Sequence, residues 1–168
     1  MDRGRYLEAA IATDLPEKMV FVAGPRQVGK TTLARRVLRG HPGGAYLSWD
    51  NREDRRDIRA ARWPGGKALV VLDELHKWRG WKGWLKGEFD KHRAHLRFLV
   101  TGSARLDVYR KGGDSLQGRY HHYRLHPFSY AEAASQSPPQ VPEPRKELAI
   151  PDRGQNDLVA ALLAFGGF

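Results

Sequence analysis

The most constraining feature of the sequence is the stretch MVFVAGPRQVGKTT at residues 19–32. An apolar run at residues 19–23 leads directly into Gly-x-x-x-x-Gly-Lys-Thr, which is the P-loop pattern in the strand-loop-helix setting that it requires. The backbone N–H groups of such a loop bind phosphate oxygens, and the helix that follows turns its positive dipole end toward them. The stretch therefore predicts a site for a nucleoside triphosphate.

Each residue type in this loop has an expected task. Gly24 and Gly29 suit the tight, positive-φ positions of the loop. Lys30 would reach the β- and γ-phosphates, and Thr31 would offer its hydroxyl to Mg²⁺, a hard cation that prefers oxygen ligands. Arg26 would point outward toward the nucleotide or a partner, and a simple surface position is the alternative. The residues expected to contact the nucleotide are Gly24, Pro25, Arg26, Gln27, Val28, Gly29, Lys30, Thr31 and Thr32.

A second apolar run, ALVVLDE at residues 68–74, ends in two acids, which is the Walker B arrangement. Asp73 would hold Mg²⁺ through its water shell, and Glu74 sits where a general base could orient the attacking water. The alternative is that the two acids only begin a helix. The P-loop upstream favours the catalytic interpretation.

Two further groups of side chains are candidates for the reaction. Residues 97–100 predict a strand that runs into Thr101-Gly102-Ser103, where Thr101 or Ser103 could touch the γ-phosphate or the water, with an ordinary turn as the alternative. An arginine finger gives a large rate gain in phosphoryl transfer. Arg119 is the preferred candidate for this role and Arg105 the second, and a place on the surface is the alternative for both.

Apolar runs alternate with helical segments along the first part of the chain. Strands are expected at residues 19–23, 45–49, 68–72, 97–100 and 120–125, and helices at 5–13, 30–38, 50–62 and 81–95. This alternation implies βαβ units and a mostly parallel sheet, and continuously apolar strands imply burial on both faces. We expect an ATPase domain at residues 1–134, a Pro-rich linker or arm at 135–156, and a short helical end at 157–168 that begins a truncated C-terminal region.

The composition narrows the class of protein. The chain has 168 residues and no cysteine, which excludes disulfides and thiolate metal sites and fits a reducing interior. No apolar run approaches the ~20 residues of a membrane span, and the first residues lack the apolar core of a signal peptide. We therefore expect a cytoplasmic protein with no membrane partner.

The charge of +10 would attract polyanions. Residues 52–62 and 77–97 are rich in Arg and Lys, so DNA or RNA is one partner that fits, and a solvated Arg-rich surface is the alternative. Trp78, Trp81 and Trp84 recur at every third residue and could stack bases. Such a stripe more often packs a helix against its sheet.

Together, the segments GPRQVGKTTL, LDELHKWRGWKGWLK, FLVTGSARL and LQGRYHHYRLHPFSYAE resemble the bacterial and archaeal AAA-type P-loop ATPases that carry a second, C-terminal domain. The resemblance covers residues 1–134 and about the last dozen residues. It implies a three-layer α/β sandwich with a five-stranded sheet ordered 5-1-4-3-2 and helices on both faces. It also implies ATP as the nucleotide and Mg²⁺ as the metal. Members of the family usually run well beyond this chain, so it looks like a fragment or a natural truncation.

The leading hypothesis is a Mg²⁺-dependent ATPase that acts as a switch or motor on a partner, in a homo-oligomer if a neighbouring subunit supplies the finger. One alternative is a small-molecule kinase of the P-loop class, which needs an acceptor pocket and a mobile basic lid. The acidic strand end and the Thr-Gly-Ser segment favour water as the acceptor. The other alternative is a basic nucleic-acid-binding module with a regulatory nucleotide site.

Overall fold

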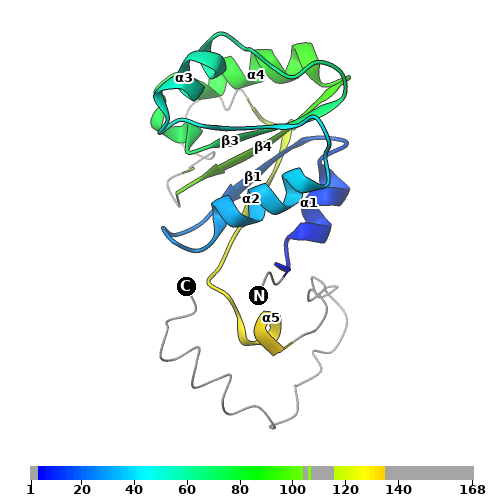
Figure 1. The fold of residues 1–168 in the computed structure, drawn as a ribbon, viewed down its shortest axis with the longest axis vertical. Helices are drawn as coiled ribbons and strands as arrows, with labels where there is room; N and C mark the ends of the chain where they lie inside the picture. The colour runs from blue at the N-terminus through cyan, green and yellow to red at the C-terminus, as the bar shows by residue number, and fades with distance from the viewer. Residues whose placement is uncertain (1–3, 104–105, 107–115, 135–168) are drawn as a thin grey trace.

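Parallel strands connected by helices make up the structure, a computed structural model that describes residues 4–103, 106 and 116–134 (Figure 1). The strands are β1 (Met19–Ala23), β2 (Ala45–Ser48), β3 (Ala68–Asp73), β4 (Leu96–Gly102) and β5 (Tyr120–Arg124). The helices are α1 (Glu8–Asp14), α2 (Lys30–Arg39), α3 (Arg52–Arg59), α4 (Trp81–His92) and α5 (Tyr130–Ala134), and a 3₁₀ helix, η1 (Leu75–Lys77), follows β3.

The five strands form one sheet in the order β2-β3-β4-β1-β5, and every neighbouring pair is parallel. This is the expected order 5-1-4-3-2, and the sheet is parallel throughout rather than mostly so. In a parallel sheet all carboxyl ends lie at the same edge. The segments that follow β1, β3 and β4 therefore meet there, which is the usual place for a ligand site in such folds.

Alternation along the buried strands divides the core into two layers. In β1, Met19 and Phe21 join the cluster that includes residues of α4, whereas Val20 and Val22 join the cluster that includes residues of α1 and α2. Figure 1 shows α3 and α4 on one side of the sheet and α1 and α2 on the other. The expected three-layer sandwich with helices on both faces is confirmed.

The three tryptophans pack in the hydrophobic layer on the α4 side of the sheet. Trp81 is buried and meets the ring of Phe21 edge-on at 5.8 Å. Trp78 stacks on Trp49 at 4.9 Å, and Trp84 lies tilted against Trp78 at 5.1 Å. Packing of a helix against the sheet therefore accounts for the spacing of the tryptophans.

The helix α3 is shorter than expected, because a side-chain cap fixes its start and a left-handed residue follows its end. The helix expected over residues 50–62 is capped by the Asn51 side chain, which accepts from the N–H groups of Glu53 and Asp54, and it ends at Arg59, shortly before Ala61 takes a left-handed conformation (φ 50°). Helix α5 was not expected. None of the helices among the described residues is long and apolar enough to cross a membrane. The expected linker at 135–156 and the helical end at 157–168 lie outside the described residues.

Candidate nucleotide site

The loop between β1 and α2 has the conformation of a phosphate cradle. Gly29 caps α2 with φ 91°, in the left-handed region as expected, and Gln27 also has a positive φ (63°). The expected positive φ at Gly24 is wrong. Gly24 is instead required by close packing, because a Cβ there would lie 2.6 Å from the carbonyl oxygen of Leu125 and 3.1 Å from a methyl of Val28.

The Lys30 side chain lies back along this loop. It is buried, and its Nζ donates to the carbonyl oxygens of Gly24 (3.0 Å) and Pro25 (2.6 Å). Burial lowers the pKa of Lys30 below its ordinary value, and the nearby carboxylates of Glu74 and Asp73 oppose that shift. The ammonium group is therefore held by the loop that a triphosphate would occupy.

Asp73 is the centre of a cluster of hydroxyl groups at the carboxyl edge of the sheet. The register of the strands places Asp73 beside Thr101 on β4 and beside Ser48 on β2. Thr31 donates to Asp73 Oδ2 at 3.0 Å, Tyr46 donates to the same oxygen, and Thr101 donates to Oδ1. Burial and the Asp73 hydrogen bond together raise the pKa of Tyr46 above its usual value. Among the described residues no cation pairs with the Asp73 carboxylate.

The residues around the Asp73 carboxylate fit a magnesium ion. A hydroxyl and a carboxylate, from Thr31 and Asp73, lie within hydrogen-bond distance, and both are hard oxygen ligands of the kind Mg²⁺ prefers. The described part of the chain has no group of three or more His, Cys, Asp or Glu side chains that could hold a metal by themselves. Such a sparse set suits an ion that completes its coordination with phosphate oxygens and water.

Glu74 follows Asp73 in a strained conformation. Its φ is 57°, in the left-handed region that a non-glycine residue rarely adopts, and its N–H donates to the Thr101 carbonyl at 3.0 Å. Its carboxylate lies 3.3 Å from Lys77 Nζ, which also pairs with Asp50 at 2.6 Å. The hydrogen bonds from Lys77 to Asp50, and then to Glu74, raise the pKa of Lys77.

The Glu74 carboxylate also faces His76 and, beyond it, Ser103. His76 Nε2 lies 3.8 Å from Glu74 Oε2 and 3.0 Å from Ser103 Oγ, while its Nδ1 is buried with no hydrogen-bond partner among the described residues. Burial lowers the pKa of His76, which favours a neutral ring. Of the two sensor candidates, Thr101 contacts Asp73 and Ser103 contacts the histidine beside Glu74.

Arg119, the preferred candidate for the arginine finger, does not join this group within the chain. It directly precedes β5, and its carbonyl accepts from the N–H of Met19 at the start of β1, so it lies at the amino edge of the sheet. Its guanidinium donates to both carboxylate oxygens of Asp90 on α4, at 2.8 and 3.1 Å. Any role of Arg119 in catalysis would require the site of another copy. Arg105 lies outside the described residues.

The remaining loop residues lie largely on the surface. Pro25, Arg26, Gln27, Thr31 and Thr32 are exposed, whereas Val28 is buried. Arg26 therefore faces solvent in this structure. One side of the loop is therefore open to solvent, and the other side packs into the core through Val28.

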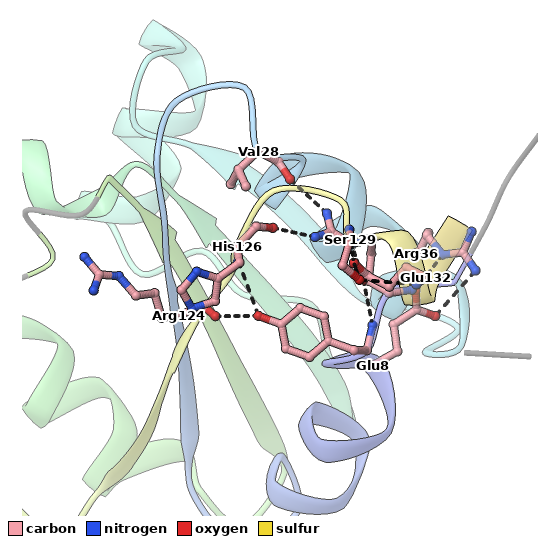
Figure 2. A network of polar contacts seen from close by, with 9 residues as sticks. Glu8, Val28, Arg36, Arg124, His126, Ser129 and Glu132 are labelled. Atoms are coloured by element: carbon pink, nitrogen blue, oxygen red, sulfur yellow. Dashed lines mark hydrogen bonds and ion pairs between the residues drawn. The ribbon is translucent and has the colours of Figure 1, made fainter. Parts of the chain in front are cut away.

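A buried ion pair behind the P-loop was not expected. Arg5 donates from Nε to Glu132 Oε1 (2.8 Å), from Nη1 to the Val28 carbonyl (2.9 Å) and from Nη2 to the His126 carbonyl (2.6 Å). Figure 2 shows Val28, His126 and Glu132 converging on this network from three parts of the chain. The guanidinium thus ties the P-loop backbone to the segments before α1 and after β5.

Glu132 completes the network as part of a capping box. Its carboxylate accepts from the Ser129 N–H (2.8 Å), from Ser129 Oγ (3.0 Å) and from the Tyr6 N–H (3.1 Å), and its own N–H donates to Ser129 Oγ. Burial alone would raise the pKa of Glu132, but the bonds from Ser129 and Arg5 hold it below the ordinary value. The Ser-x-x-Glu spacing at 129–132 was the one available signal, whereas nothing local pointed to Arg5.

Comparison with known proteins agrees with this geometry. A protein family described as "AAA domain" matches residues 16–134. No curated protein sequence matches the chain. Among solved structures, the Aeropyrum pernix ORC1 protein in complex with DNA is similar over 77% of this chain, with a TM-score of 0.55 and 16% identity, and C. elegans PCH-2 over 70%, with a TM-score of 0.47 and 14% identity.

The chain spans less than half of either solved protein, 47% of the ORC1 chain and 40% of the PCH-2 chain. At such identity the likeness to ORC1 concerns the fold alone. The family match covers most of the chain and contains the P-loop, the acidic strand end and the Thr-Gly-Ser segment. The chain therefore belongs to the AAA domain family of P-loop ATPases.

Proposed function

We propose that this chain binds ATP with Mg²⁺ and hydrolyses it, and that the reaction switches or drives a partner. The observation that carries the proposal is the 3.0 Å hydrogen bond from Thr31 Oγ1 to Asp73 Oδ2. It joins the first turn of the P-loop helix to the end of the acidic strand. A hydroxyl and a carboxylate so placed are what a phosphate-bound magnesium ion requires from the protein.

Lys30 and the loop backbone would bind the triphosphate. The ammonium group now donates to two loop carbonyls, and a phosphate oxygen would give it a stronger, charge-assisted partner. The left-handed conformation at Gly29 opens α2 with N–H groups free to face the ligand. The exposed loop residues, Arg26 among them, would contribute further contacts.

Thr31 and Asp73 would hold Mg²⁺, with Tyr46 and Thr101 fixing the orientation of the carboxylate. When bound, the ion neutralises the charge on the phosphate oxygens and orients them. The hydroxyl cluster fixes the carboxylate in advance, so little reorganisation would accompany binding.

Glu74 would act as the general base that positions and deprotonates the attacking water. Its contact with Lys77, which is also bound by Asp50, holds the carboxylate in place. Ser103 and His76 lie where a change at the γ-phosphate could reach Glu74.

Two substitutions test the proposal in the full chain. Lys30→Ala should weaken ATP binding at least 100-fold by calorimetry, whereas Glu74→Gln should bind ATP normally and lose phosphate release. Lys91→Ala, an exposed lysine of α4, is the control and should match the parent chain. Unchanged ATP affinity in Lys30→Ala would refute the nucleotide site. ADP formation that requires an added acceptor, with the phosphoryl group on that acceptor and no free phosphate released, would instead favour the kinase.

A further inference from the structure

Helix α3 carries a stripe of arginines on one face. Arg52, Arg55, Arg56 and Arg59 occupy positions i, i+3, i+4 and i+7, and residues with this spacing lie on the same side of an α-helix. They line a hollow of about 330 Å³, and no other residue of the described part of the chain is in its lining. The described lining of the hollow is therefore cationic.

Two of the three acids of α3 have partners other than these arginines. Asp54 accepts from the backbone N–H of Ser48 at 2.8 Å, and Asp57 pairs with Arg62 at 3.0 Å. Among the described residues, no carboxylate lies within ion-pair distance of the four guanidinium groups that line the hollow. Four adjacent like charges repel each other, so a multivalent anion would relieve the repulsion.

Part of the stripe is held in place before any partner binds. The Arg59 guanidinium lies over the ring of Trp49 at 5.3 Å and over that of Trp78 at 6.0 Å, and these two rings are stacked. Arg55 Nε donates to the carbonyl of Asn51, the residue that caps the helix. Ordering these side chains in advance reduces the entropy lost when a ligand binds.

The shape and composition of the stripe select among anions. Seven residues of helix advance about 10 Å, whereas one strand of duplex DNA advances about 3.4 Å per phosphate. The stripe thus extends along about three successive phosphates of a strand, whereas a nucleoside triphosphate holds its three phosphates close together. The one apolar residue of α3, Ile58, is fully buried. The helix therefore offers no apolar side chain for insertion into a lipid surface.

We propose that the arginine face of α3 binds the phosphodiester backbone of a nucleic acid. Arginine suits this task because its planar guanidinium makes paired hydrogen bonds to phosphate oxygens. The proposal deepens the proposed function by naming the class of its partner, and it uses none of the residues of the nucleotide site. Helix α3 lies on the opposite side of the sheet from α2, so both ligands could be bound together (Figure 1).

The experiment measures binding of the full chain to a fluorescent 20-base-pair duplex of mixed sequence, by anisotropy, without ATP and between 50 and 200 mM NaCl. The variant R52A/R55A/R56A leaves Arg59 on its tryptophans. It should bind at least tenfold more weakly at 100 mM NaCl. The slope of log affinity against log salt should become shallower by about 2–3, since each phosphate contact contributes about 0.9.

The matched control, K67A/K91A/R93A, removes three exposed cations elsewhere and should weaken binding twofold or less. Circular dichroism should show that both variants are folded like the parent chain. A lysine triple, R52K/R55K/R56K, should recover part of the affinity because the charge is kept. A single-stranded RNA of the same length, run in parallel, shows which of the two nucleic acids supplies the phosphates.

Equal weakening by the two alanine triples would overturn the proposal, because net charge would then explain the binding. No detectable binding by the parent chain at 50 mM NaCl would overturn it too. So would α3-dependent binding to vesicles of phosphatidylserine and phosphatidylcholine without binding to nucleic acid. Lys30→Ala should bind the duplex like the parent chain, so failure of the nucleotide site and failure of this surface are separate results.

Discussion

Two buried carboxylates lie near the P-loop, and they have different partners. Glu132 is paired with the Arg5 guanidinium and accepts from Ser129 and Tyr6. Within the described residues, Asp73 receives side-chain hydrogen bonds from three hydroxyl groups and pairs with no cation. The first carboxylate is paired with a cation of the described chain, and the second is not. The contrast agrees with a structural role for Glu132 and with the proposed role of Asp73 as a metal ligand.

The largest effect is expected from breaking the structural pair. Arg5→Ala would leave the fully buried Glu132 carboxylate without its cation and should lower the free energy of unfolding by about 3–5 kcal/mol. Urea denaturation measures this loss. The control is Asp90→Ala, which removes the surface partner of Arg119 and should leave the unfolding midpoint almost unchanged. Equal losses in both variants would remove the distinction between the two pairs.

Asp73, the proposed metal ligand, should respond in the opposite way. Asp73→Asn removes the charge that Mg²⁺ needs while keeping the shape of the side chain. We expect the free energy of unfolding to change by less than about 1.5 kcal/mol. The Mg²⁺ dependence of ATP binding, measured by titration calorimetry, should be lost. If Asp73→Asn is strongly destabilised but its folded form still binds MgATP, Asp73 would have a structural role like that of Glu132.

Tyr46 gives a smaller effect on the same cluster. Tyr46→Phe removes one hydroxyl that donates to Asp73 but keeps the ring under the Arg35 guanidinium. The loss of one hydrogen bond should cost about 0.5–1.5 kcal/mol of stability. MgATP affinity should fall severalfold, because the carboxylate is less well oriented. Wild-type affinity for MgATP would show that the remaining two hydroxyls suffice.

The smallest effect concerns pH. Burial lowers the pKa of His76 in the folded state, so the unfolded chain binds its proton first as the pH falls. The stability from this group is complete above pH ~6.5, the pKa of an unperturbed histidine, and decreases as the pH falls from there toward the folded pKa. His76→Gln should flatten that part of the stability curve. A difference between the two proteins that does not depend on pH would contradict this.

The sequence predicted the parts of the site that follow apolar strands. Asp73 and Thr101 stand at or near the ends of buried strands, and Lys30 follows the loop that leaves the buried strand β1. A parallel sheet brings such positions to one edge. Arg119 precedes its strand, so the same rule places it at the other edge. Arg5 and Glu132 could not be paired in advance, because they are 127 positions apart and their contact depends on the complete fold.

Tyr46 illustrates another limit of sequence analysis. It lies inside the second strand and has no motif of its own. Its hydroxyl reaches Asp73 only because β2 lies beside β3 with Tyr46 opposite Val71. Gly24 is similar, because its lack of a side chain is required by Leu125, a residue that only the finished sheet brings close. Both assignments depend on contacts between distant segments.

The strand order also has a consequence for how the chain folds. β1, which carries the P-loop, is made early but lies between β4 and β5, whose residues come much later in the chain. During synthesis from the N-terminus, the apolar β1 has no neighbour in the sheet until β4 has been made. Contacts so distant in sequence slow folding and prolong the exposure of apolar strands. A nascent chain that stops before residue 96 should therefore be aggregation-prone despite an intact P-loop sequence.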